Sequence, residues 1–186
     1  MKHRILGLIA AGALAASGSA SSAVIFTISQ VGGDVVITGS GSYDLTGAAL
    51  IGGGVQDGYI NSSLGLAVGG PFGSVDFYAL TENPGAFGTG DYLNGSPDFG
   101  DRFGLDVINI GGFITVPQGY AGGPLSGSTI FSGQTYASLG LTAGSVYTYR
   151  IANDSMTLRV VPEPGTLALL GLGLAGLGLS RRRRAT

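Results

Sequence analysis

The sequence lacks several side chains on which enzyme active sites depend. Its 186 residues include no cysteine, no tryptophan and a single histidine, His3, and the single lysine, Lys2, lies beside it. Beyond these first residues the chain has no thiol, imidazole or lysine amine. This excludes Ser-His-Asp and Cys-His catalysis, Schiff-base chemistry, and ordinary zinc or copper sites. Without disulfides, the fold must be held by burial and backbone hydrogen bonds alone.

The first 23 residues have the three-part pattern of a secretory signal peptide. Lys2 and Arg4 are positively charged, residues 5–16 are apolar, and small residues follow them. The small-x-small rule places the signal cleavage site between Ala23 and Val24. The alternative interpretation is a retained N-terminal anchor helix.

The last 26 residues contain three signals in direct succession. Pro162-Glu163-Pro164 is expected to be stiff and extended, because proline fixes φ and disfavours helix at the preceding residue. Residues 167–179 are all Leu, Gly or Ala, and with Thr166 and Ser180 they predict a transmembrane helix, residues 166–180, of roughly 22 Å, slightly short for a bilayer. Arg181, Arg182, Arg183 and Arg184 then form a membrane stop that stays on the cytoplasmic side. The alternative is a buried core helix followed by a solvated basic tail.

These residues resemble the PEP-CTERM sorting signal of exported bacterial proteins. In that family an exosortase, an integral membrane protease or transpeptidase, is thought to recognise and process the signal. The resemblance implies that Pro162, Glu163 and Pro164 are the sorting motif, and that signal peptidase and an exosortase-type enzyme are partners. It also implies an inner-membrane precursor that later reaches the cell surface or the extracellular space. The same region is also labelled an ice-binding protein C-terminal domain, a label that says nothing about ice binding by the preceding residues.

Residues 24–160, between the two signals, are expected to form one extracytoplasmic domain, called the body here. Between Val24 and Val161 ten carboxylates stand against three arginines, a formal charge of −7. A body this acidic is not expected to bind nucleic acid. The chain is glycine-rich, with 36 glycines, and the body has no sustained helical period. Short β-branched or aromatic runs between turn residues predict an all-β fold, a single antiparallel β-sandwich or jelly-roll-like domain.

About eight to ten short strands are expected at this spacing. The clearest runs are residues 24–29, 35–38, 74–80, 102–108, 112–116, 128–131, 146–152 and 155–161. Gly32-Gly33 and Asn153-Asp154 are expected to be the turns of the first and last hairpins.

One loop has the composition of a calcium site. Asp91, Asn94, Asp98 and Asp101 offer hard oxygen ligands in a glycine-rich stretch, which calcium prefers. Their spacing does not match a known calcium loop, so the preferred interpretation is a set of turns with Asp101 near Arg102, and no metal or other cofactor is expected.

The combined expectation is a non-enzymatic exported protein of the cell envelope or extracellular matrix. One alternative is a secreted carbohydrate-active enzyme that uses paired carboxylates. A second alternative is a carbohydrate- or ice-binding module, with extracellular polysaccharide as its candidate partner.

Overall fold

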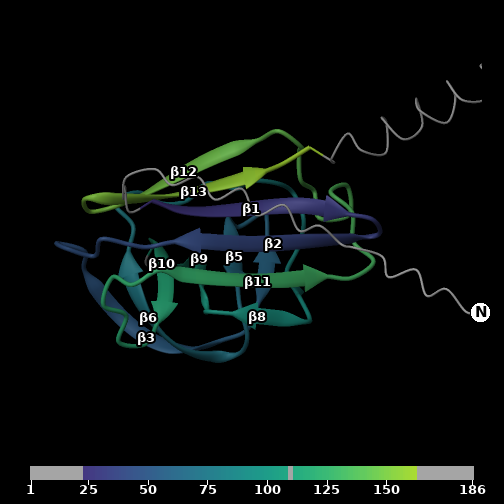
Figure 1. Cartoon of the computed structure of the whole chain (residues 1–186). Helices are drawn as coiled ribbons and strands as arrows, with labels where there is room; N and C mark the ends of the chain where they lie inside the picture. Colours follow the sequence, from purple (N-terminus) through teal and green to yellow (C-terminus); the bar gives the residue numbers. More distant parts are fainter. Residues whose placement is uncertain (1–22, 109–110, 163–186) are drawn as a thin grey trace, which may run out of the picture.

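Two β-sheets packed face to face make up the part of the chain that the computed structural model describes, residues 23–108 and 111–162 (Figure 1). Within these ranges there is no helix, and so none long and apolar enough to cross a membrane. The all-β prediction is confirmed for these residues. The expected signal peptide, the transmembrane helix 166–180, Glu163, Pro164 and Arg181 to Arg184 lie outside them.

The strands are divided between a six-stranded and a seven-stranded sheet. The first sheet has the order β12 (Val146–Ile151), β13 (Asp154–Val160), β1 (Val24–Val31), β2 (Asp34–Gly41), β11 (Leu125–Phe131) and β8 (Asp98–Gly100). The second has the order β3 (Leu50–Gln56), β6 (Gly73–Ala79), β10 (Gly111–Pro117), β9 (Phe103–Ile108), β5 (Leu66–Gly69), β4 (Tyr59–Asn61) and β7 (Leu93–Asn94). The described residues therefore hold more strands than the eight to ten expected.

The strands of the two sheets cross at a steep angle. In Figure 1, β1, β2 and β11 run across the view, whereas β5 and β10 run up and down it. This corresponds to the orthogonal class of sheet packing. The core fills the space between: the rings of Phe26 on β1 and Phe103 on β9 lie 4.9 Å apart, and both side chains are fully buried.

The expectation of a purely antiparallel fold was wrong at one strand pair. β1 and β13 are parallel, with Val24 opposite Met156 and Ile28 opposite Val160. The first and last strands of the body therefore lie side by side in the sheet. This pairing joins strands more than 120 residues apart, and hairpin patterns in the sequence report only neighbouring strands.

The last hairpin is present, but its turn is one residue earlier than expected. Ile151 pairs with Asp154, so the turn residues are Ala152 and Asn153. Ala152 has a φ of 43°, which is unusual for a residue with a side chain. Tertiary contacts fix this register, because Asp154 Oδ2 accepts a hydrogen bond from the N–H of Asp44 at 2.8 Å. By contrast, the hairpin turn at Gly32-Gly33 lies where it was predicted.

Candidate functional site

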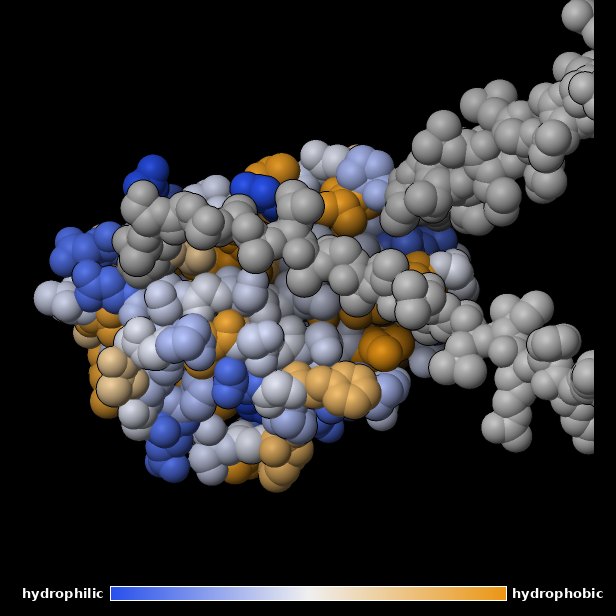
Figure 2. Space-filling model, in the orientation of Figure 1, coloured by the Kyte–Doolittle hydropathy of each residue, from blue (hydrophilic) through white to orange (hydrophobic). Residues whose placement is uncertain are grey.

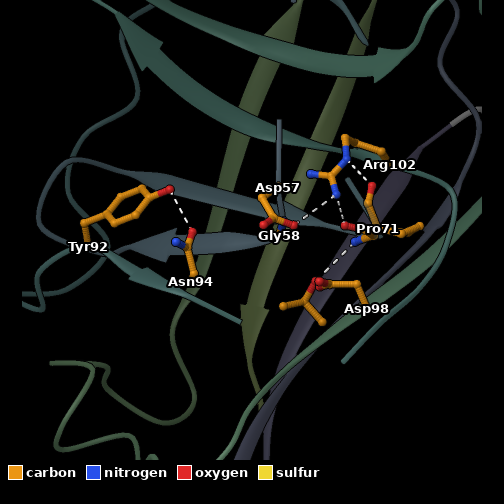
Figure 3. Close-up of polar contacts among 9 residues, drawn as sticks. Asp57, Gly58, Pro71, Tyr92, Asn94, Asp98 and Arg102 are labelled. Carbon is orange, nitrogen blue, oxygen red and sulfur yellow. Dashed lines mark hydrogen bonds and ion pairs between the residues drawn. The ribbon is translucent and has the colours of Figure 1, made fainter. Parts of the chain in front are cut away.

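A buried arginine lies at the centre of one polar cluster in the described residues. Arg102 precedes β9, and its side chain is 3% exposed. Its Nε donates a hydrogen bond to the carbonyl of Pro71, and Nη2 donates to the carbonyl of Gly70 (Figure 3). Nη2 also lies 3.9 Å from Oδ1 of Asp57. Burial lowers the pKa of Arg102, and the charge of Asp57 opposes that shift. The cluster therefore fastens the loop after β5 to the start of β9.

The turn between β3 and β4 requires a glycine beside this arginine. The N–H of Gly58 donates to Oδ1 of Asp57 at 3.0 Å. A Cβ at Gly58 would overlap both Oδ1 of Asp98 and Oγ1 of Thr129, which are themselves hydrogen-bonded to each other. Close contact between β8, β11 and this turn thus joins the edges of the two sheets.

A buried carboxylate, Asp106, lies on β9, on the opposite face from the core residue Leu105. Asp106 is 6% exposed and accepts hydrogen bonds from the hydroxyl of Tyr59 and, at 2.6 Å, from Nε2 of Gln56. Burial raises the pKa of Asp106, and these hydrogen bonds oppose the increase. Burial and the neighbouring carboxylate also raise the pKa of Tyr59. The donors available to Asp106 explain how the fold tolerates a buried acid.

The candidate calcium ligands are not gathered around one point. Asp98 accepts the Thr129 hydroxyl, and Asp101 Oδ2 accepts the N–H of Ser126 at 2.9 Å. The side chain of Asn94 accepts the hydroxyl of Tyr92 instead, and Figure 3 shows it well away from Asp98. Across the described ranges, no group of three or more His, Cys, Asp or Glu residues could hold a metal ion.

Asp101 was expected to lie near Arg102 as its charge partner. The ion pair that the structure shows for Arg102 is with Asp57 instead. Burial raises the pKa of Asp98, with the Thr129 hydrogen bond opposing the shift. Asp98 is thus held by the fold rather than presented to a ligand.

Several hollows lie on the surface of the described residues. Four of them, of about 250 to 440 Å³, are each lined by no more than one acidic side chain. Glu82 lines two of these hollows, and Asp44 lines the largest. Glycoside hydrolysis needs a facing pair of carboxyl groups, which none of these four hollows provides.

The C-terminal junction of the body is the other candidate site. The N–H of Val160 donates to the carbonyl of Ser145 at 2.9 Å, and its own carbonyl accepts the N–H of Gly144 at 2.6 Å. The side chain of Val160 is buried, whereas Pro162 is exposed. The folded body therefore ends within two residues of the predicted sorting motif.

Comparison with family models identifies that junction as the beginning of a sorting signal. A model described as the PEP-CTERM protein-sorting motif matches residues 160–184. Comparison with curated proteins and with solved structures found no match. The described part is thus a β-sandwich, and the chain carries a PEP-CTERM protein-sorting motif directly after its last strand. The motif supports sorting by an exosortase to the cell envelope or extracellular space.

The sequence predicted the sorting residues but not the contacts around them. Of the motif, Pro162 is described and exposed, and the expected cleavage site at Ala23 and Val24 lies at the start of β1. The sequence analysis missed the Tyr59–Asp106 and Asp57–Arg102 contacts. These residues are 47 and 45 positions apart, and no local pattern connects them.

Proposed function

We propose that the chain is a non-catalytic exported protein of the cell envelope or extracellular matrix. A signal peptide directs it out of the cytoplasm, and its C-terminal helix holds an inner-membrane precursor until an exosortase processes it. The observation that carries this proposal is the sorting-motif match at residues 160–184, which begins at the final residue of β13. The body is the part that is exported, and the motif directs where it is sorted.

Two observations support a non-catalytic body. The sequence beyond residue 23 contains no His, Cys or Lys. The half-buried Asp98 and the buried Asp106 have hydrogen-bond donors within the fold, as structural acids do.

The experiment replaces Pro162 and Pro164 with alanine in the full chain, expressed with its exosortase. Alanine allows helix to extend back through Glu163, which removes the extended strip. Membrane insertion should survive, and a full-length precursor should accumulate on an immunoblot. Processing of this double variant like the wild type would reduce the signal to a plain membrane anchor.

A carbohydrate-binding body is a second candidate, favoured by the outer face of the six-stranded sheet. One row across four strands pairs Thr27 with Thr38, Thr38 with Ser128, and Ser128 with Phe99. Figure 2 shows the surface over β2 and β11 as mostly pale, neither strongly hydrophilic nor hydrophobic. Hydroxyl groups and an aromatic ring together suit the polar edges and apolar faces of sugars.

A shallow hollow of about 300 Å³ lies at the Phe99 end of this row. The Phe99 side chain is 55% exposed there. If this face binds a neutral polysaccharide, Phe99→Ala should weaken retention on an immobilised glucan about tenfold. Phe72→Ala, at another exposed phenylalanine, is the matched control. Equal retention of both variants and the wild type would exclude this face as the binding site.

A further inference from the structure

Val161, the residue immediately before Pro162-Glu163-Pro164, is held to the body through both its N–H and its carbonyl group. The N–H of Val161 donates to the carbonyl of Ile28 on β1 at 2.9 Å. The carbonyl of Val161 accepts a hydrogen bond from the hydroxyl of Tyr136. Val161 also precedes a proline, which confines it to extended conformations. The chain is therefore ordered up to the peptide bond that enters Pro162.

Tyr136 is itself held in place by a reciprocal pair of contacts with Gln30. The N–H of Gln30 donates to the Tyr136 hydroxyl at 2.8 Å, and the Gln30 side-chain oxygen accepts the N–H of Tyr136 at 2.8 Å. The Tyr136 side chain is largely buried and packs with the main core. The hydroxyl that contacts Val161 therefore has a fixed position.

The end of β13 cannot easily be pulled out of the sheet. β13 lies between β12 and β1, so opening it breaks hydrogen bonds on both of its sides. Pro162, unlike the residues at the end of β13, is exposed and has no N–H to donate. A processing enzyme that approaches the folded protein thus meets a sharp boundary between Val161 and Pro162.

We propose that Tyr136 is a positioning residue for the sorting motif. By holding the Val161 carbonyl it presents Pro162 as the first residue that the enzyme can grip, and it keeps the cleaved bond at Pro162 or further towards the C-terminus. This inference rests on the proposed function, since it assumes that an exosortase processes the motif. Enzymes that cut peptides bind them as extended strands with free backbone groups, and a pre-ordered strip loses less entropy on binding.

The cleavage step itself is ordinary peptide-bond chemistry. The C–N bond breaks, and the acyl group passes to water in hydrolysis or to an acceptor amine in transpeptidation. The departing amide nitrogen takes up a proton. Tyr136 is assigned no part in this step, because its hydroxyl contacts the backbone before the motif.

The test compares Tyr136→Phe with the wild type in the full chain. Loss of the hydroxyl removes one hydrogen bond from Val161, so the ratio of precursor to mature protein should rise about two- to tenfold. Tyr120→Phe is the matched control, because the Tyr120 hydroxyl also joins a backbone donor and acceptor, Tyr43 and Gly123, away from this junction. Tyr120→Phe should be processed like the wild type. Equal ratios for Tyr136→Phe and the wild type would overturn the proposal.

A second variant tests the same coupling without changing Tyr136, so that slow processing cannot be attributed to a folding defect of Tyr136→Phe. A Gly-Ser-Gly-Ser insertion between Val161 and Pro162 keeps every contact of the body but uncouples the motif from it. Processing should slow here too, whereas faster processing would show that the junction hinders the enzyme and would contradict a positioning role. Mass spectrometry of the mature wild-type C-terminus should show Val161 retained, and a mature chain that ends before Val161 would also overturn the proposal.

Failure of this inference can be distinguished from failure of the proposed function. If the Pro162 and Pro164 double variant is blocked but Tyr136→Phe behaves like the wild type, the sorting assignment stands and the positioning role does not. If the double variant is processed normally, the sorting assignment itself is wrong.

Discussion

The hydroxyl of Tyr59 donates a hydrogen bond to Oδ2 of Asp106, and both side chains are buried on the face of the seven-stranded sheet that points away from the main core. Gln56, at the end of β3, donates to the same oxygen at 2.6 Å. One carboxylate on β9 therefore joins the end of β3 and the start of β4, which lie about 50 residues earlier in the chain. A buried acid held in this way is costly to leave without its donors.

Tyr59→Phe is expected to destabilise the protein by about 1–3 kcal/mol, because it leaves the buried Asp106 short of a donor. Tyr92→Phe removes a hydroxyl that bonds the exposed Asn94, and it should change the free energy of unfolding by less than about 0.5 kcal/mol. Urea unfolding of the two variants checks the difference. Similar losses for both would show that the Asp106 contact is not special.

The stability of the protein should depend on pH through Asp106. Burial raises its pKa above the ordinary value of 3.8. Between that value and the raised one, the folded state binds a proton that the unfolded state has released, so the unfolding free energy falls as pH rises through this interval. Asp106→Asn lacks this dependence. The unfolding free energy of the wild type should therefore fall towards that of Asp106→Asn as pH rises from about 4 towards 7, and the difference between the two proteins should become smaller.

Urea midpoints measured across that range test the pH prediction. Parallel curves for Asp106→Asn and the wild type would contradict the assignment to Asp106.

Calcium should have little effect on the body. Asp98 and Asp101 accept hydrogen bonds from within the fold, and Asn94 lies apart from them. Millimolar calcium is expected to shift the melting temperature by less than about 1 °C. A rise of several degrees that Asp98→Asn abolishes would establish the calcium site that the loop composition suggested.

Gly104→Ala should be among the most damaging single substitutions. A Cβ there would overlap the carbonyl oxygen of Ala67 and lie 2.6 Å from Cα of Val68, both backbone atoms of the neighbouring strand. We expect a loss of at least about 2 kcal/mol. Gly33→Ala places its methyl in open space and should cost under about 1 kcal/mol. Thermal melting of both variants gives the comparison.

The charged parts of the sorting signal should fail in different ways. Glu163→Ala should slow processing while the strip stays extended, if a basic group of the exosortase reads the carboxylate. Replacement of Arg181 to Arg184 by serine should leave recognition intact but loosen retention, because the cytoplasmic stop is lost. Immunoblots of precursor and mature forms in membrane and medium separate the two defects. Uncleaved protein in the medium is expected for the serine variant alone.

Local patterns predicted most of the longer strands, but not β3. Alternation and turn residues placed β1 and β2 and the Gly32-Gly33 turn between them, because a half-buried hairpin leaves a period of two. β3 was missed because three of its seven residues are glycines, which have low β propensity. β3 needs a glycine at position 53 because of the neighbouring strand β6: a Cβ at Gly53 would come 2.8 Å from the carbonyl oxygen of Val75.

The site residues, like the strands, could be predicted only where the signal is continuous in the sequence. The sorting motif is continuous in sequence, so it could be read directly, and the family match confirms a PEP-CTERM sorting motif at residues 160–184. The contact between Tyr136 and Val161, and the pairing of Asp57 with Arg102, depend on strand order. Strand order is set by packing over the whole domain, which no local period reports.

The parallel pairing of β1 with β13 has a consequence for how the protein is made. β1 is the first strand to emerge during synthesis and β13 is the last, yet they are neighbours in the middle of one sheet. Pairings between such distant segments form late, because a long loop must close first. The six-stranded sheet therefore stays incomplete until residue 160 has left the ribosome. The last strand of this sheet and the sorting motif are therefore synthesised one directly after the other. A truncated chain lacks both the complete sheet and the sorting motif.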